Sequence, residues 1–153
     1  MKSRLRNRAI SASINRKILA EWQELDLYDP ELMNILTTSV DHNALHEITG
    51  VLCYGNGYFV QCLEGEKSKV SNLYFDRILK DPRHKGCQIL YFEEQVERLF
   101  PEWAMKFAPI NPSIRAFFQQ QYAEEFNPTL LTARTIGPFI KLLAQQNAWE
   151  YYI

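Results

Sequence analysis

The sequence predicts an α+β fold: a ferredoxin-like βαββαββ sheet with two helices on one face, followed by further helices at the C-terminus. The clearest signal is the turn Gly55-Asn56-Gly57, which separates two apolar runs of strand length and tolerates the positive φ angles of a tight hairpin. One helical segment precedes this hairpin and another follows it. Right-handed crossovers between strands then place both helices on the same side of the sheet.

Length and composition indicate a globular chain. Its 153 residues are 46% apolar and 23% charged, so a buried core is expected and disorder is not. The net charge of −1 gives no reason to expect binding to nucleic acid. No apolar run approaches the roughly 20 residues of a membrane span, and the N-terminus lacks the apolar stretch of a signal peptide. We therefore expect no membrane association and a location in the cytoplasm.

The first half of the chain supplies a strand, a helix and the hairpin. Residues 5–13 are predicted as the opening strand, and residues 14–28 are ambiguous. Asp29-Pro30-Glu31 starts a helix, because aspartate caps it, proline fits the first helical position and an acid suits the first turn. This helix should end near residues 41–43. The hairpin strands are then expected at residues 48–54 and 58–63.

The second half adds a helix, two strands and the C-terminal helices. An apolar helical face is followed by Asp81-Pro82, and strands are expected at residues 87–92 and 103–107. Two more helical stretches open at residues 111 and 127, and Gly137-Pro138 must kink or split the second. Their apolar stripe, which includes Trp149, needs burial on the far side of the sheet or on another subunit. We divide the chain into a domain at 1–108 and a helical extension at 109–153.

No residue pattern alone indicates an enzyme or a metal site. The three cysteines, Cys53, Cys62 and Cys87, lack paired spacing and a nearby histidine, and are interpreted as buried free thiols. Gln61 stands out because it lies in the middle of an otherwise apolar strand. A buried amide without hydrogen-bond partners costs roughly 1–3 kcal/mol. Gln61 on a solvated face is the alternative.

Five pieces of the sequence, in order and spacing, resemble the BLUF family, the blue-light sensors that use flavin. The pieces are residues 43–44, 48–54, 57–65, 81–84 and 100–105, and the resemblance covers roughly residues 5–108. The tail, particularly Phe126-Asn127-Pro128, is similar to short BLUF proteins that carry a helical extension and no separate output domain. The resemblance implies bound FAD or FMN, no catalytic turnover, signalling through a protein partner, and a homo-oligomer.

The resemblance also implies roles for the polar residues that match. Gln61 is expected to face N5 and the C4 carbonyl of the flavin, where an amide offers both a donor and an acceptor. Asn43 is expected to pair with the carbonyl and imide edge of the ring. Trp103 and Met105 correspond to the pair that competes for the space beside the glutamine and reports its state outward.

The remaining matches concern the walls and the ribityl side of the flavin. Asp81, Arg83 and His84 correspond to the loop near the ribityl chain and the phosphate, since a basic pair suits a phosphate and a carboxylate can accept from hydroxyls. Apolar walls are expected from Ile48, Phe59 and Leu63. His42 and His46 receive no role.

The first strand departs from the family pattern. That strand normally carries a tyrosine two residues before a serine; here Ser13 keeps the serine and Ser11 stands at the tyrosine position. The spacing from Ser11 to Asn43 is also longer, which puts an insertion at residues 15–27. In the resembled domains the excited flavin takes an electron and a proton from the tyrosine. An alkyl hydroxyl is far harder to oxidise than a phenol, so we expect a blocked or altered photocycle.

Two other functions stay open. One is a degenerate BLUF scaffold that has lost its flavin and acts only as an interaction protein. The other is a small flavin-dependent redox protein, which would need a substrate opening beside N5, where Gln61 and Trp103 are expected. The colour of the purified protein separates the first alternative from a flavoprotein, and turnover with a nicotinamide would reveal the second.

Overall fold

The protein, seen here as a computed structural model, is described for residues 6–15 and 30–146. Its sheet contains β1 (Arg6–Asn15), β2 (Thr49–Gly55), β3 (Tyr58–Gly65), β4 (His84–Val96) and β5 (Lys106–Pro109) in the order β4-β1-β3-β2-β5. β1 runs antiparallel to both of its neighbours, β2 and β3 form the hairpin, and β5 is parallel to β2. The predicted ferredoxin-like α+β sheet is confirmed.

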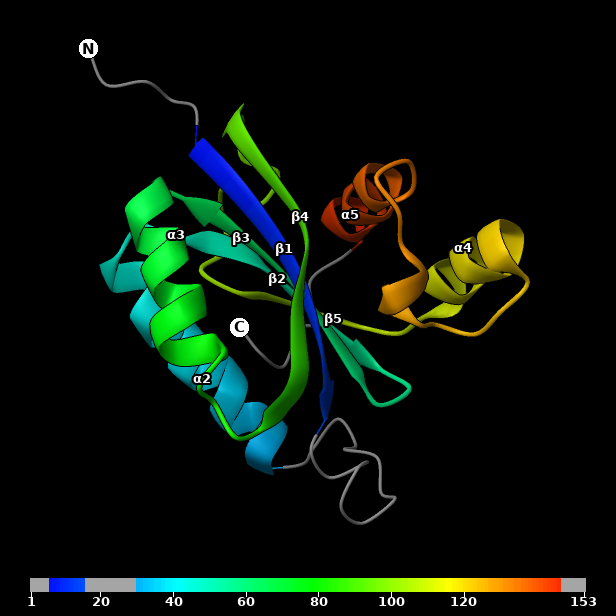
Figure 1. Cartoon of the computed structure of the whole chain (residues 1–153), viewed down its shortest axis with the longest axis horizontal. Coiled ribbons are helices and arrows are strands. Elements are labelled where there is room, and N and C mark those ends of the chain that lie inside the picture. Colours follow the sequence, from blue (N-terminus) through cyan, green and yellow to red (C-terminus); the bar gives the residue numbers. More distant parts are fainter. Residues whose placement is uncertain (1–5, 16–29, 147–153) are drawn as a thin grey trace.

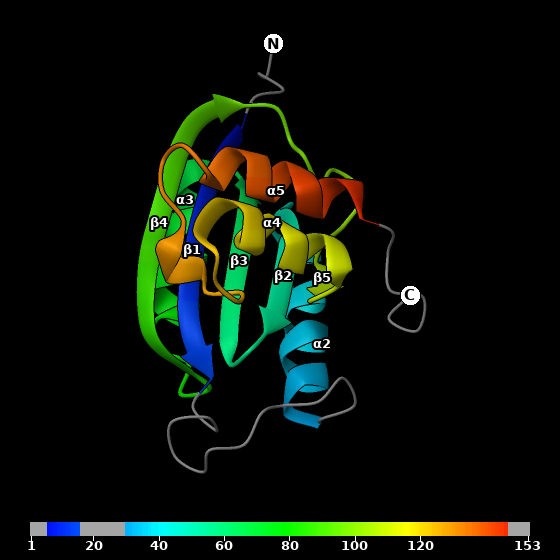
Figure 2. The ribbon, with the colours of Figure 1, turned by 90° about the vertical axis from the view of Figure 1, so that its right-hand side faces the viewer.

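Helices cover both faces of this sheet. On one face lie α2 (Pro30–Leu45), α3 (Lys67–Leu73) and the π-helical turn η1 (Tyr74–Ile78), which continues α3. On the other lie α4 (Pro112–Tyr122), the short 3₁₀ turn η2 (Pro128–Leu130) and α5 (Ile136–Gln145), as the edge-on view in Figure 1 and the turned view in Figure 2 show. Within the described residues, the C-terminal apolar stripe is therefore buried on the far side of the sheet of the same chain.

Glycines fix the hairpin at two places. Asn56 and Gly57 have φ angles of 50° and 81°, as the predicted tight turn requires. At Gly50 a Cβ atom would lie 1.9 Å from the carbonyl oxygen of Cys62 in β3, so any larger residue would push the two strands apart.

The sheet separates two apolar cores, because successive side chains of each strand point to opposite faces. The helix-side core, under α2, α3 and η1, includes Leu32, Leu52, Phe59, Leu63, Met105 and Phe107. The tail-side core, under α4 and α5, includes Ile10, Val51, Val60, Cys62, Phe118, Phe139 and Leu143.

Several sequence-based boundaries differ from the structure. The strand predicted at residues 103–107 begins only at Lys106, because a turn precedes it in which the Trp103 amide donates to the carbonyl of Phe100. β4 runs from His84 to Val96 and so extends beyond the predicted residues 87–92 at both ends. Gly137-Pro138 lies in the first turn of α5 and does not interrupt a helix, since a proline there forfeits no intrahelical hydrogen bond.

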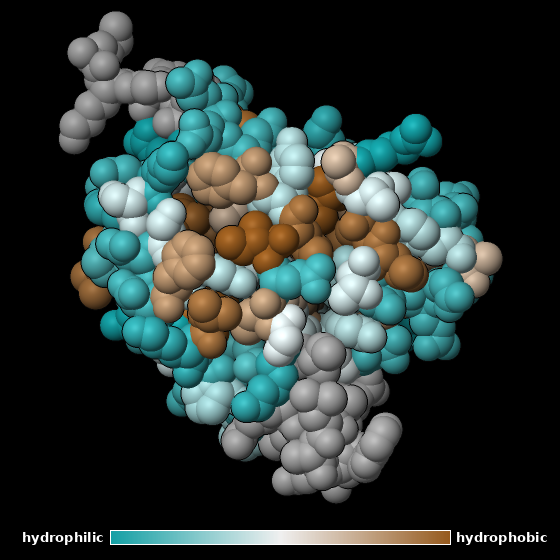
Figure 3. All heavy atoms as spheres, viewed as in Figure 1, coloured by the Kyte–Doolittle hydropathy of each residue, from teal (hydrophilic) through white to brown (hydrophobic). Residues whose placement is uncertain are grey.

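Some predicted features lie outside the described residues, and others are confirmed only in part. Most of the proposed insertion, residues 16–27, and Trp149 lie outside the described residues. Cys53 and Cys62 are buried free thiols as predicted, whereas Cys87 is only half-buried. No helix within residues 30–146 is long and apolar enough to cross a membrane. Apolar side chains also reach the surface over the β4 edge, where Figure 3 shows them gathered, and they include Ile89 and Phe92.

Candidate functional site

A cavity of about 440 Å³ opens between α2 and η1, with the β3 strand at its base and residues 81–84 at its rim. Its volume lies in the range of small-molecule and cofactor sites. The residues that line it are Ile35, Thr38, Ser39, His42, Gln61, Leu73, Arg77, Ile78, Asp81, Pro82, Arg83 and His84. The cavity thus combines an apolar wall with an amide, two histidines and two guanidinium groups.

Gln61 is the polar group at the base of this cavity. It lies on β3, directly across from Ser11 on β1 and Leu52 on β2, and is 7% exposed. Among residues 6–15 and 30–146, no hydrogen-bond partner occurs for its side-chain amide or for the hydroxyl of Ser11, which is 6% exposed. A solvated position for Gln61 is therefore wrong. Its amide is a buried polar group that a ligand in the cavity would satisfy.

Asp81 holds Arg83 at the rim. The Arg83 Nε donates to Asp81 Oδ1 at 2.9 Å and its terminal nitrogen lies 2.6 Å from Oδ2, while another terminal nitrogen donates to Asn34 Oδ1 of α2 at 2.8 Å. Burial acts to raise the pKa of the Asp81 carboxyl, but the hydrogen bonds from Arg83 and the charges of His84 and Arg83 outweigh it, so the pKa is lowered. Arg83 is thereby positioned beside the cavity as a fixed cation.

His84 closes the inner edge of the rim. Its Nδ1 lies 3.1 Å from the hydroxyl of Ser13 on β1, and its ring meets that of Phe59 edge-on with centroids 4.7 Å apart. Burial lowers the pKa of His84, helped by the charge of Arg83 and opposed by the carboxylate of Asp81. The imidazole is therefore neutral at pH 7. Ser13 on β1 and the cavity rim are joined through this histidine.

Asn43 lies at the end of α2 and does not line the cavity. It is fully buried, and its Nδ2 donates to the carbonyl of Ala104 at 2.8 Å. The amide of Gly50 donates to the carbonyl of Trp103 at 3.0 Å, so α2 and β2 both hold the segment before β5. Met105 is 6% exposed and packs in the helix-side core, whereas Trp103 is half-buried.

The predicted site residues thus fall into two groups. Four of them line the cavity together: Gln61, Asp81, Arg83 and His84. The predicted apolar walls Ile48, Phe59 and Leu63 lie with Met105 in the core next to it, and neither Trp103 nor Met105 is among the lining residues.

Sequence reasoning missed the polar face of α2. Thr38, Ser39 and His42 line the cavity, and together with Ile35 they recur at the three- and four-residue spacing of one helical face. Burial lowers the pKa of His42, and the charges of Arg77 and His46 act in the same direction against a hydrogen bond with Asn43. The signal was present in the sequence, but the apolar stripe at Leu32 and Leu36 obscured it because it lies beside this face.

Comparison with known proteins agrees with this geometry. Residues 14–106 match the BLUF family model, described as "Sensors of blue-light using FAD". The structure named "BlsA photo-activated state" superposes with a TM-score of 0.84 and 32% identity over 95% of this chain and 99% of that one. "BlrB - a BLUF protein, dark state structure" gives a TM-score of 0.61 and 26% identity over 92% of this chain and 93% of that one.

Matches to larger proteins cover only a part of each. The photoactivated adenylate cyclase subunit beta of Euglena gracilis is 43% identical over 79 residues, which are 51% of this chain and 9% of that protein. The structure of a bacterial light-regulated adenylyl cyclase gives a TM-score of 0.62 and 35% identity over 76% of this chain and 31% of that one. This chain therefore spans only about a tenth of the length of the curated relatives it matches.

Proposed function

Because the chain belongs to the BLUF family of blue-light sensors that use FAD, we propose that the cavity between α2 and η1 holds the ring of a flavin. The observation that carries this proposal is Gln61, a buried amide at the base of the cavity without a partner among the described residues. A flavin ring offers acceptors and a donor on one edge, and an amide can pair with either kind.

The chain's own residues have distinct parts in this proposal. Gln61 forms hydrogen bonds with the polar edge of the flavin ring. The apolar side chains of Ile35, Leu73 and Ile78 pack against the faces of the ring. Asp81 and Arg83 stand at the rim, where a carboxylate can accept from ribityl hydroxyls and a guanidinium can bind a phosphate. The flavin supplies the absorption of blue light. The family description names FAD, and the ring cavity itself does not distinguish FAD from FMN.

Asn43 and the segment before β5 form the proposed route outward. Asn43 is a ring-contacting residue in our sequence-based interpretation, and its hydrogen bond to the Ala104 carbonyl supports a coupling between α2 and that segment. Met105 follows one residue later and packs in the helix-side core, while Phe107 of β5 lies in line with Gln61 across β2. A rearrangement of the Gln61 amide would then change the packing of Met105 and so the position of β5. Trp103 lies two residues before Met105, in the turn that precedes β5.

Ser11 makes the expected photocycle abnormal. It faces the same side of the sheet as Gln61 and is its cross-strand partner, which supports the assignment of this position to the family's tyrosine. A serine hydroxyl does not donate an electron to an excited flavin as a phenol does. We therefore propose a sensor domain in which the usual light reaction is blocked or altered.

An absorption spectrum before and after blue light tests the proposal. We expect the purified protein to be yellow and to show no slowly reverting red shift, and Ser11→Tyr to gain that shift. Gln61→Leu in the Ser11→Tyr background should bind flavin without shifting. A normal red shift in the unaltered protein would contradict the block at Ser11. A protein that stays colourless after flavin is supplied would favour the scaffold that acts only as an interaction protein.

Signalling through a separate protein remains a proposal. It is supported by the relatives named as photoactivated adenylate cyclases, in which the matched segment is a small part of a longer chain. Residues 1–108 are the proposed sensory part, and residues 109–153 the part that contacts a partner or a second copy. The absence of turnover, the homo-oligomer and the cytoplasmic location stay predictions from the sequence.

A further inference from the structure

β4 forms one edge of the sheet. In the order β4-β1-β3-β2-β5 it pairs with β1 on one side and, among the described residues, with no strand on the other. It is 13 residues long, from His84 to Val96. An edge strand presents a row of backbone N–H and C=O groups without partners, and these can pair with a strand of another chain.

The middle of this edge is apolar. Ile89 and Phe92 are 46% and 40% exposed, and Leu90 and Tyr91 between them are half-buried. Figure 3 shows apolar side chains gathered over this edge. Ile89 lies opposite Ser11 of β1, so its side chain projects from the helix side of the sheet. An exposed apolar stretch on a long edge strand is typical of a contact with another chain.

The two ends of this edge carry opposite charges. Lys85, near the start of β4, is exposed and forms no ion pair with any residue of 6–15 or 30–146. Glu93 and Glu94, near its end, have side chains that are 40% and 52% exposed. Glu94 pairs with the exposed Lys67 at 2.8 Å, a kind of surface contact that contributes little stability.

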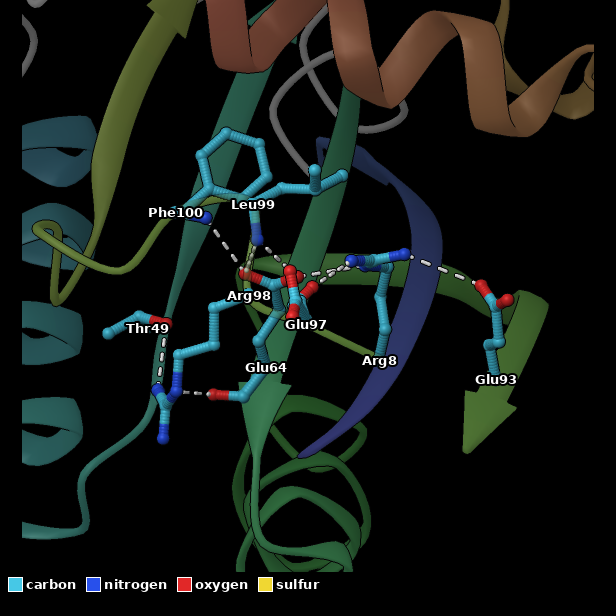
Figure 4. Close-up of polar contacts among 8 residues, drawn as sticks. All are labelled: Arg8, Thr49, Glu64, Glu93, Glu97, Arg98, Leu99 and Phe100. Atoms are coloured by element: carbon cyan, nitrogen blue, oxygen red, sulfur yellow. Dashed lines mark hydrogen bonds and ion pairs between the residues drawn. The ribbon is translucent and has the colours of Figure 1, made fainter. Parts of the chain in front are cut away.

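Figure 4 shows how Glu93 is held from within. Its carboxylate lies 3.4 Å from Arg8 of β1, whereas Arg8 lies 2.8 Å from the fully buried carboxylate of Glu64. Arg8 also donates to the carbonyl of Glu97 at 2.8 Å. Arg8 therefore faces two carboxylates and binds the buried one more closely. Glu93 is positioned by this contact and still presents an exposed carboxylate to a cation from outside.

The arrangement of these groups is self-complementary. Lys85 and Glu93 both lie opposite even-numbered residues of β1, which face the tail-side core. If two β4 strands pair antiparallel about a twofold axis near Leu90, Lys85 of each copy comes beside Glu93 of the other. The same axis brings Ile89 beside Phe92 on the helix side. Parallel pairing in register would bring like charges together instead.

We propose that two copies of this chain pair antiparallel along β4 and so join their sheets into one. Lys85 of each copy binds Glu93 of the other, and Ile89 packs against Phe92. None of these four residues lines the cavity between α2 and η1, so the contact does not depend on the flavin.

This surface lies one strand away from the position that decides the light reaction in the proposed function. Ile89 is the cross-strand neighbour of Ser11, and Ser11 is the cross-strand neighbour of Gln61. A second copy on β4 would therefore contact the same row of side chains that begins at the cavity.

Sedimentation velocity of the flavin-loaded full chain, at about 1–500 µM, tests the proposal. We expect a monomer–dimer equilibrium with a Kd below about 100 µM. Ile89→Lys should raise this Kd at least about tenfold, because it places an ammonium against the Phe92 ring of the other copy. The matched control is Leu45→Lys. Leu45 is 82% exposed on α2, close to Asn43, which bonds the segment before the opposite edge strand, so Kd should change less than about twofold.

The charges give a second test. Lys85→Glu should raise Kd about three- to tenfold at low salt, and less at high salt, because it places like charges together. Lys80→Glu makes the same charge change at an exposed lysine outside β4 and should change Kd less than about twofold. A carbodiimide, which joins an amine directly to a carboxylate, should link Lys85 of one copy to Glu93 of the other in a mixture of isotope-labelled and unlabelled protein.

Several outcomes would overturn this surface. They are a protein that is still monomeric at about 500 µM, a dimer that Ile89→Lys leaves intact, or one that Leu45→Lys weakens as much. Cross-links confined to residues 109–153 would place the second copy on the tail instead. If Ile89→Lys does not fold, Lys85→Glu and the cross-link still decide the matter. A protein that stays colourless but dimerises in this way would contradict the proposed flavin and leave this surface in place.

Discussion

At the scale of single residues, the cavity rim depends on a neutral histidine. His84 joins Ser13 of β1 to the ring of Phe59, and burial holds its pKa below the ordinary value of 6.5. An unfolded chain regains the ordinary pKa. At a pH between the lower pKa of the folded protein and the pKa of 6.5 in the unfolded chain, the unfolded chain binds more protons than the folded protein. The contribution of His84 to stability is therefore fully present above pH 6.5 and is lost as the pH falls through the folded pKa.

We therefore predict that the melting temperature falls between pH 7.5 and pH 5.0, and that His84→Gln reduces this fall. A glutamine can keep the hydrogen bond to Ser13 but does not titrate. The pKa of the Asp81 carboxyl is lowered from 3.8, so that residue does not titrate in this window. Thermal unfolding by circular dichroism measures the effect.

The matched control is His46→Gln, because His46 is exposed and does not line the cavity. Since His46 acts on the cavity only through its neighbour His42, His46→Gln should change the fall in melting temperature less than His84→Gln does. An identical pH dependence for His84→Gln and the unaltered protein would show that His84 is not the titrating group.

At the scale of elements, one buried lysine fastens β5 to the end of α5. Lys106 is 4% exposed, and its ammonium donates to the carbonyls of Leu143 at 3.0 Å, Ala144 at 3.3 Å, and Gln146. Burial lowers the pKa of Lys106. These carbonyls are left without partners where a helix ends, and the helix dipole favours a cation there.

We predict that Lys106→Met lowers the free energy of unfolding by about 1–2 kcal/mol, the upper part of the range for a cation at a helix C-terminus. Urea denaturation measures this value. Lys141→Met removes an exposed lysine from α5, the helix whose end Lys106 binds. Its free energy of unfolding should stay within about 0.5 kcal/mol of that of the unaltered protein. Equal stability of the two variants would mean that the free-energy cost of removing the Lys106 ammonium from water cancels the stabilisation that its hydrogen bonds provide.

The order of elements was predictable from the sequence, and their ends were less so. The hairpin was predictable because Asn56 and Gly57 carry the turn in their own backbone preferences. The start of β5 was not, since the turn that delays it to Lys106 is held by contacts from α2 and β2, residues distant in sequence. Gln61 is recognisable in the sequence as a polar exception in an apolar strand. The helical spacing of His42 was also present in the sequence, but its place at the cavity follows only from the packing of α2 opposite η1.

At the scale of the molecule, the tail and the sensory part share one core. Side chains from β1, β2 and β3 pack directly against α4 and α5 in the tail-side core, with Phe118 and Phe139 fully buried among them. The proposed division at residue 108 therefore separates two functional parts and does not separate two independent structural cores. Hydrophobic side chains on that sheet face would meet water if the tail were absent.

We predict that a protein ending at residue 108 is insoluble or aggregates on expression, while the full chain stays monodisperse or forms a defined oligomer. Size-exclusion chromatography with light scattering measures the outcome. A soluble, folded 1–108 fragment that binds flavin as the full chain does would show that the tail-side core contributes little to folding.

β5 has a further property that follows from its two-sided packing. Met105 faces the helix-side core and Lys106 the tail-side core, in immediate succession. Sliding the strand by one residue would bring an ammonium into an apolar interior and detach the end of α5. A slide of two residues would restore the facing of the side chains but would still take Lys106 away from the carbonyls of Leu143, Ala144 and Gln146. β5 is thus held in a single register, and longitudinal sliding is excluded as a way for this strand to move.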